Sequence, residues 1–354
     1  MTKLRLSVLD QTPVGEDHTP DRALRASVDL ARAAESLGYT RYWVAEHHDS
    51  PGFASSAPEI LAGTLLAHTS RMRIGTGGVL LPRYDPAKVA EVFGVLASLH
   101  PGRVDLGIGR AGGPARDFPQ RLAGLRALLG EGGVVPHAPV PPQMWLLGAG
   151  RESARLAGLL GTEFAFGHFF SPTGGREAFE DYRAHVRTST GDRPGGALAV
   201  RVVTADSAGR AEELAQSLLL WRARKDLGED GPLPSYETTR RHRWTGAERE
   251  RAEVHRTALV SGAPEQVSAV LTALAASHGV DELIINTLTC DPADRGRSYE
   301  LLSEAFDLQA PDPQASDLQA SDLQAPDPRS AVPAAVSDLA LRSQERSRPQ
   351  VWSV

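Results

Sequence analysis

The chain has 354 residues, of which 41% are hydrophobic and 23% charged, a composition typical of a folded globular protein. Its single cysteine excludes an internal disulfide framework and a multi-cysteine zinc or iron–sulfur site. A formal net charge of -6 argues against a nucleic-acid binder driven by bulk charge, and no run of residues is apolar enough to span a membrane. The first residues lack the apolar core of a signal peptide, so we predict a cytoplasmic protein.

The composition changes sharply after Phe306. From there the unit Asp-Leu-Gln-Ala recurs at Asp307, Asp317 and Asp322, with Pro-Asp-Pro and Ala-Ser between the copies. Such a polar segment buries too little apolar surface to offset its chain entropy. We therefore predict one domain over residues 1–306 and a low-complexity disordered tail over residues 307–354.

Short apolar runs alternate with amphipathic stretches along the domain. Strands are predicted at 4–9, 42–45, 72–76, 103–107, 144–147, 163–166, 198–203 and 282–286. Helices are predicted at 20–37, 58–68, 86–99, 118–129, 152–160, 176–186, 207–224, 264–277 and 297–306. The first helix has a capping hydroxyl at Thr19, Pro20 at its first position and Gly38 at its end.

Strict alternation of strand and helix predicts a parallel sheet with right-handed crossovers. Eight such units in about 300 residues predict a (β/α)₈ barrel, and an open doubly wound sheet is the alternative. In a barrel, chemistry lies at the C-terminal ends of the strands, where polar residues and glycines gather in this sequence.

Glu46, His47 and His48 directly follow the second strand. Neighbours on a strand point to opposite sides, so the two histidines are poorly arranged to bind one ion, and we predict no metal site. A single histidine facing the barrel mouth suits a general base, because its ordinary pKa lies near 6.5. A polar strand end that caps the next loop is the simpler alternative.

The segment after the fourth strand contains a literal GxGxxG pattern, formed by Gly107, Gly109 and Gly112. A dinucleotide site needs a helix to begin at once, whereas Pro114 and the residues after it indicate a loop. Arg110 within this loop is suited to a phosphate or a carboxylate.

Gly148, Ala149 and Gly150 lead from the fifth strand into a helix that carries Ser153. The free N–H groups of a helix start, with the Ser153 hydroxyl, suit a phosphate, and a simple helix cap is the alternative.

His168 and two following phenylalanines are suited to wall an organic ligand, although a packed loop explains them equally well. Arg222, Arg224 and Lys225 are interpreted as a solvated helix face. Cys290 has no visible histidine partner and is interpreted as a passive residue.

Four motifs follow one another in the chain. They are the opening Leu-Ser-Val-Leu-Asp-Gln at 6–11, Ala-Glu-His-His at 45–48, Arg-Met-Arg-Ile-Gly-Thr-Gly-Gly-Val-Leu-Leu-Pro at 71–82 and Pro-Gly-Arg-Val-Asp-Leu-Gly-Ile-Gly-Arg at 101–110. In these motifs the sequence resembles the bacterial-luciferase-like flavin-dependent monooxygenases, over nearly all of residues 4–306. The opening is most similar to the branch found beside bacterial natural-product pathways. The resemblance implies a (β/α)₈ barrel that holds FMN, or in some members coenzyme F420, at the strand C-termini.

The resemblance also implies roles for individual residues. His47 matches the family's active-site base, and the Gly77–Gly78 bond stands where the family has a non-prolyl cis peptide against the flavin ring. Arg110 matches the arginine that reaches the flavin phosphate, and Ser153 matches a phosphate-binding hydroxyl. The remaining site residues are Ala149 and Gly150 at the cofactor and Gln11, Glu46 and His168 in the substrate pocket.

Three positions depart from the family pattern. Gly150 stands where many relatives have a second phosphate-site serine, and Asp85 stands where histidine or asparagine is common. The segment after Arg110 is shorter than the relatives' loop that helps to close the site.

The resemblance implies an enzyme that uses externally reduced FMN and O₂ to oxygenate a small organic substrate, in secondary metabolism such as antibiotic biosynthesis. A separate flavin reductase is the expected partner, and homodimers are common in the family. One alternative is a coenzyme F420-dependent reductase or dehydrogenase, with Arg116, Arg121 and Arg151 near the acidic tail of F420. Another is a non-catalytic flavin-binding subunit, against which the retention of His47 argues.

Overall fold

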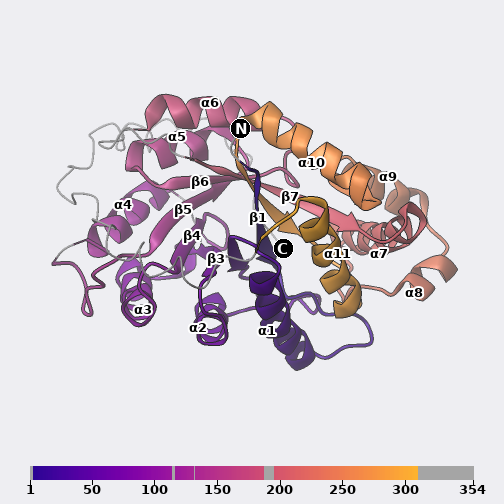
Figure 1. Cartoon of the computed structure of the whole chain (residues 1–354), viewed down its shortest axis with the longest axis horizontal. Coiled ribbons are helices and arrows are strands. Elements are labelled where there is room, and N and C mark those ends of the chain that lie inside the picture. The colour runs from indigo at the N-terminus through magenta and orange to yellow at the C-terminus, as the bar shows by residue number, and fades with distance from the viewer. Residues whose placement is uncertain (1–2, 114–115, 131, 187–194, 310–354) are drawn as a thin grey trace.

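The eight predicted strands close into a parallel barrel surrounded by helices (Figure 1). The computed structural model describes residues 3–113, 116–130, 132–186 and 195–309. The barrel strands are β1 (Arg5–Asp10), β2 (Arg41–Val44), β3 (Arg73–Leu80), β4 (Val104–Gly109), β5 (Gln143–Gly148), β6 (Glu163–Gly167), β7 (Ala197–Thr204) and β9 (Glu282–Asn286). Each pairs in parallel with the next, and the β6–β7 and β1–β9 pairings complete the ring. The closed ring confirms the barrel and excludes the open sheet.

The helices form the outer layer of the barrel. They are α1 (Pro20–Ser36), α2 (Pro58–His68), α3 (Pro86–Leu99), α4 (Phe118–Leu128), α5 (Arg151–Leu160), α6 (Gly175–His185), α7 (Ala208–Asp226), α10 (Pro264–His278) and α11 (Pro292–Ala305). Gly38 ends α1 with a φ of +85°, as expected for a left-handed terminal glycine. The Thr19 hydroxyl, in contrast, makes no capping hydrogen bond, so the start of α1 relies on the preset φ of Pro20.

An insertion between α7 and α10 is absent from the sequence-based assignment. It contains α8 (Tyr236–Arg241), α9 (Gly246–Arg256) and the short strand β8 (Leu259–Gly262), which pairs in parallel with the last residues of β7. The strand has only four residues and two short polar helices precede it, so hydrophobic periodicity gives little signal here.

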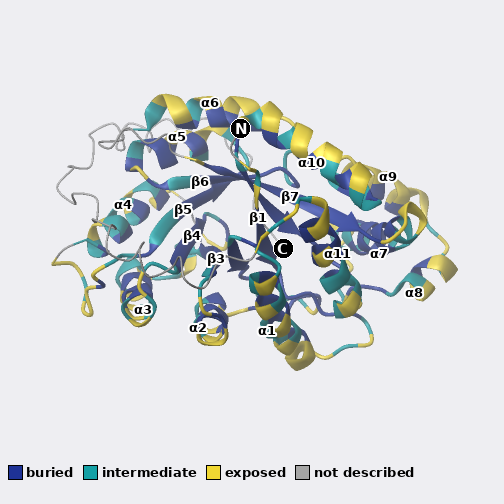
Figure 2. Ribbon diagram, in the orientation of Figure 1, coloured by how far each residue is buried: buried dark blue, intermediate teal, exposed yellow. Residues whose placement is uncertain are grey.

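Two apolar layers follow from the alternation of side chains along the strands. Residues that point outward pack against the helices, whose exposed faces line the periphery of the molecule while the strands are buried (Figure 2). Residues that point inward fill the barrel, and they are Leu9, Trp43, Ala45, Trp145, Leu147, Ala165, Phe169, Ala197, Ala199 and Ile284.

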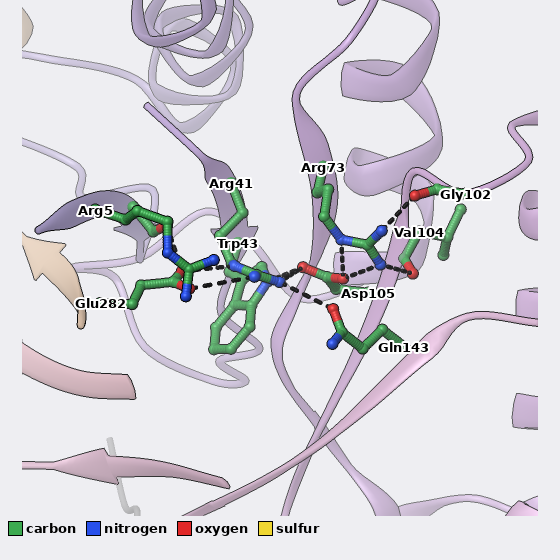
Figure 3. A network of polar contacts seen from close by, with 10 residues as sticks. Arg5, Arg41, Trp43, Arg73, Gly102, Val104, Asp105, Gln143 and Glu282 are labelled. Atoms are coloured by element: carbon green, nitrogen blue, oxygen red, sulfur yellow. Dashed lines mark hydrogen bonds and ion pairs between the residues drawn. The ribbon is translucent and has the colours of Figure 1, made fainter. Parts of the chain in front are cut away.

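A buried ion network closes the N-terminal end of the barrel (Figure 3). The Nε of Arg41 donates to Glu282 at 2.6 Å, and its Nη1 donates to Asp105 at 2.7 Å. Arg73 Nη2 and Trp43 Nε1 also donate to Asp105, at 2.6 and 2.9 Å. The carboxylates and guanidinium groups of this network partner one another, so the network has a structural role at this end of the barrel.

The described chain continues past the expected domain boundary at residue 306. The Leu308 N–H donates to the Ser303 carbonyl at 2.9 Å, and Lys3 forms an ion pair with Asp307 at 3.2 Å. Residues 307–309 therefore lie against the barrel, while the rest of the predicted disordered tail, 310–354, lies outside the described residues. No helix in the described part of the chain is long and apolar enough to cross a membrane.

Candidate active site

A cavity opens at the C-terminal end of the barrel strands. It has about 530 Å³ of empty space, a figure that includes space open to solvent. Six of the eight barrel strands or the residues just after them contribute to its wall, together with the β6–α6 connection and α7. The lining residues are Leu9, Gln11, Ala45, Glu46, His47, Gly77, Gly78, Leu80, Gly109, Leu147, Phe170, Arg201 and Arg222.

His47 follows β2 and faces this cavity. Its ring stacks on Phe53 with centroids 3.9 Å apart, and its Nε2 lies 3.1 Å from the Nε2 of Gln11. Burial lowers the pKa of His47 to about 3, and the positive charges of Lys225 and Arg222 add to the effect. The ring is therefore neutral at pH 7, and its buried Nδ1 has no hydrogen-bond partner among the described residues.

Glu46 and His48 fix the end of β2 against the end of β3. The buried Glu46 carboxylate accepts hydrogen bonds from the Leu80 N–H at 2.8 Å, the Tyr84 hydroxyl at 2.7 Å and His48 Nε2 at 2.6 Å. His48 thus has a different partner from His47, as the strand geometry predicts. Within the described ranges no group of three or more His, Cys, Asp or Glu residues could hold a metal ion.

Gly77 and Gly78 form a tight part of the cavity wall, joined by a cis peptide bond as the resemblance predicts. A Cβ atom on Gly77 would lie 2.7 Å from Leu9 Cδ1. A Cβ atom on Gly78 would lie 2.6 Å from Leu147 Cδ1 and 2.7 Å from the carbonyl oxygen of Gly107. Only glycine fits at these two positions without displacing neighbours, and the pair leaves backbone exposed to a ligand.

Arg110 directly follows Gly109, which lines the cavity, but Arg110 itself is not one of the lining residues. Its Nη1 donates to Glu152 at the start of α5, at 3.3 Å, so the β4 and β5 ends of the barrel meet here. α4 begins only at Phe118, which confirms that a loop follows β4 rather than the immediate helix of a dinucleotide site. That loop includes residues 114 and 115, which lie outside the described ranges.

Ala149, Gly150 and Ser153 surround the start of α5 but do not line the cavity. Gly150 precedes the helix without a side-chain cap, and the space where its Cβ would lie is open. Ser153 packs so closely on Gly148 that a Cβ there would lie 2.4 Å from the Ser153 Cβ. The residues predicted to bind a phosphate therefore form a cluster of their own, outside the lining of the cavity.

His168 lies away from the cavity. Its neighbour Phe169 points into the barrel, so the alternation of side chains turns His168 outward, where its ring lies 6.4 Å from the His278 ring of α10. Burial, with His278 nearby, lowers the pKa of His168 to about 4. Phe170 lines the cavity from this segment instead.

Two arginines in the cavity wall are absent from the sequence-based list. Arg201 lies on the inward face of β7, and Arg222 lies on α7 with a side chain only 12% exposed. The interpretation of Arg222, Arg224 and Lys225 as a solvated helix face is wrong, since the Arg224 and Lys225 side chains are only 28% and 7% exposed, and Lys225 pairs with Asp230 at 2.8 Å. A helix apolar on several faces, as α7 is around Leu218–Trp221, is the sequence signal for this burial.

Comparison with known proteins places the chain among close relatives of similar length. It is 39% identical over 329 residues to YwcH, an uncharacterized protein of Bacillus subtilis (strain 168), covering 85% of this chain and 98% of the relative. It is 34% identical over 320 residues to a luciferase-like monooxygenase of Escherichia coli (strain K12), covering 84% and 96% of the two chains.

The solved structures agree with the sequence relatives. The crystal structure of apo-MsnO8 superposes with a TM-score of 0.77 at 36% sequence identity, covering 86% of this chain and 99% of that one. The family model described as luciferase-like monooxygenase matches residues 4–282. The chain therefore belongs to the luciferase-like monooxygenase family.

Proposed function

We propose that the protein is a flavin-dependent monooxygenase that uses reduced FMN and O₂ to oxygenate a small organic substrate. The observation that carries the proposal is the pairing of Gly77 and Gly78 with His47 around one cavity at the barrel mouth. Within a luciferase-like monooxygenase chain, this arrangement offers a planar ring a backbone surface and a neutral imidazole.

The residues present fit a flavin. A side chain at Gly78 would clash with the Gly107 carbonyl, and one at Gly77 would displace Leu9, so the two glycines leave the backbone open to the close approach of a flat ring. The buried Oε1 of Gln11 and Nδ1 of His47 have no partner among the described residues and are available to a bound ligand. Reduced FMN, when bound, supplies two electrons to O₂, so that one oxygen atom enters the substrate and the other leaves as water.

The chain's own residues position the reactants and handle protons. His47 is neutral at pH 7 and lines the cavity, so its unpartnered Nδ1 is placed to exchange a hydrogen bond or a proton with a bound ligand. Gln11 holds the imidazole ring through its Nε2. Arg110, with the start of α5, would hold the FMN phosphate by charge and hydrogen bonds. The residues around the start of α5 that we propose for this role are Ala149, Gly150 and Ser153.

Two relatives support the monooxygenase assignment. One is the N-acetyl-S-alkylcysteine monooxygenase of Bacillus subtilis (strain 168), which is 33% identical over 335 residues. The other is the oxygenating constituent of a 3,6-diketocamphane monooxygenase solved with FMN, which shares the fold with a TM-score of 0.63. An oxygenating constituent works with another component, and we propose a flavin reductase as the partner here. Secondary metabolism, a cytoplasmic location and a homodimer stay predictions.

The second candidate, an F420-dependent enzyme, shares this barrel. An F420-dependent secondary alcohol dehydrogenase superposes with a TM-score of 0.65 at 16% identity, which is a likeness of fold. Two of the three arginines considered for the F420 tail are already engaged, since Arg151 pairs with Asp181 at 2.7 Å and Arg121 donates to backbone carbonyls of the β3–α3 connection. Arg116 is exposed. Arg110, which we propose for the FMN phosphate, likewise pairs with Glu152 at 3.3 Å, so the preference for FMN rests on the monooxygenase relatives.

Anaerobic titration with reduced FMN, reduced riboflavin and F420 tests the proposal. We expect reduced FMN to bind most tightly, and Arg110→Met and Ser153→Ala to weaken reduced FMN but not reduced riboflavin. His47→Ala should lower turnover more than flavin affinity. Tight binding of F420, with no oxygen uptake when bound reduced FMN meets air, would overturn the assignment.

A further inference from the structure

We propose that Arg201, supported by Arg222, binds a carboxylate of the substrate, so that the enzyme acts on a small organic acid. This inference rests on the proposed function and names the chemical class of its substrate. Both arginines line the same cavity as His47, Gly77 and Gly78, so an acid held there has the rest of its structure within the proposed reaction chamber.

Arg201 differs from the other buried arginines in lacking a carboxylate partner. Arg41, which is 4% exposed, binds Glu282 and Asp105, and Arg295, which is 2% exposed, binds Asp10 at 2.7 Å. Arg201 is 6% exposed and forms no ion pair with any residue that the structure describes. A charge removed from water without a partner is unfavourable, so the two paired arginines show the usual structural solution and Arg201 departs from it.

The contacts of Arg201 leave the end of its guanidinium group unused. Its Nε donates to Asn286 Oδ1 at 3.2 Å, and its Cζ lies 4.9 Å from the ring centroid of Phe169. The Nη1 and Nη2 atoms make no hydrogen bond to the described residues. A guanidinium held by its Nε and by an aromatic ring presents two parallel N–H donors, the geometry that a carboxylate accepts in a bidentate pair.

Arg222 adds a second positive charge to the same wall. Its nearest carboxylate, Asp226, is 3.6 Å away and already accepts a hydrogen bond from His255 at 2.8 Å. The buried Nε of Arg222 has no partner within the described ranges. The pKa of Arg201 is lowered to about 9, by burial and by the repulsion of Arg222, and the group is still charged at pH 7. An anion between the two arginines would relieve this repulsion.

The position of Arg201 separates this subsite from the proposed phosphate site. Arg110 and Ser153 lie at the ends of β4 and β5, whereas Arg201 lies on β7, beyond β6 around the ring. The other charged group of the cavity wall, Glu46, is held by three hydrogen bonds to the chain. The Arg201 side of the cavity is therefore the part that is suited to an additional negative charge.

Binding of matched acids and amides to the flavin-free protein tests the inference. The probes are hexanoate against hexanamide and benzoate against benzamide, at constant ionic strength, read by the shift of the unfolding midpoint and by tryptophan fluorescence. The variants are Arg201→Met, Arg201→Lys and Arg222→Met, and Arg32→Met removes an exposed arginine of α1 as the control.

We expect the acids to bind and the amides not to bind. Arg201→Met should weaken the acids about 10- to 100-fold, the effect of losing a hydrogen-bonded charge pair, with Arg201→Lys intermediate and Arg32→Met unchanged. Arg201→Met should also raise the urea midpoint or leave it unchanged, because it removes an unpaired buried charge. A purely structural arginine would instead lower the midpoint when replaced.

Three results would overturn the inference. They are the absence of acid binding to the wild-type protein up to the solubility of the probes, equal binding of acid and amide, and unchanged acid binding by Arg201→Met. A loss of affinity for reduced FMN but not for reduced riboflavin in Arg201→Met would assign Arg201 to the flavin phosphate and overturn it as well. If acid binding behaves as expected but the wild-type protein binds no reduced flavin, the proposed function fails while the anion subsite stands.

Discussion

The neutral state of His47 has a consequence for stability that can be measured without a substrate. The ordinary pKa of a histidine is 6.5, whereas the pKa of His47 is lowered to about 3 in the folded protein, chiefly by burial. The unfolded chain therefore takes up a proton at this residue at a higher pH than the folded chain does. The stability linked to the neutral ring is fully present above pH 6.5 and is lost as the pH falls toward 3.

The size of the effect follows from the difference between the two pKa values. Each unit of difference corresponds to about 1.4 kcal/mol, so lowering the pH from about 7 to about 4.5 should remove about 2–3 kcal/mol through His47 alone. Other groups also titrate in this range, among them the buried His168, so the contribution has to be isolated by comparison with a variant.

Urea unfolding of the wild-type protein and of His47→Gln at the two pH values makes that comparison. The variant should lose about 2–3 kcal/mol less of its free energy of unfolding than the wild type when the pH is lowered. His137→Gln, which replaces an exposed histidine, should keep the wild-type slope. Equal slopes for wild type and His47→Gln would refute the claim that desolvation of the ring and nearby positive charges hold His47 neutral.

The remaining predictions concern the walls of the barrel. Glu46→Ala should lower the free energy of unfolding by about 2–4 kcal/mol in urea titrations, because it leaves three hydrogen-bond donors without their carboxylate. Gly78→Ala should cost about 1–3 kcal/mol and abolish flavin binding by equilibrium titration, whereas Gly124→Ala, at an open helical position, should be neutral or stabilising. Asp105→Asn should lower the free energy of unfolding by about 3–5 kcal/mol, because Arg41 loses a buried partner. The thermal midpoint should fall accordingly, and an unchanged midpoint would contradict this account of the ion network.

Much of the barrel was predictable because its strands are continuous apolar runs separated by amphipathic helices. The alternation of side chains along a strand also predicted that His47 and His48 point to opposite sides. The structure shows their rings with different partners, Gln11 and Glu46. The same periodicity does not report which face of a short segment is inward, and His168 illustrates this. A histidine at the end of a strand suggested a pocket residue, but the side chain that points into the barrel is that of Phe169.

The arginines of the cavity could not be assigned from local pattern. Arg222 belongs to α7, where the sequence alone does not reveal that the insertion of α8, α9 and β8 packs beside it. Arg201 interrupts the apolar run of β7, which is a visible signal, but whether a carboxylate neutralises it depends on residues distant in the chain. Such pairing is a property of the closed barrel rather than of any one segment.

A single-turnover reaction with ¹⁸O₂ tests the proposed monooxygenase activity most directly. The protein is loaded anaerobically with reduced FMN, mixed with ¹⁸O₂ and a panel of organic acids that includes N-acetyl-S-alkylcysteines, and the products are analysed by mass spectrometry. A flavin-dependent monooxygenase should place one ¹⁸O atom in an organic product and the other in water. Release of all the oxygen as hydrogen peroxide across the panel, with tight binding of F420 in place of FMN, would contradict the proposal.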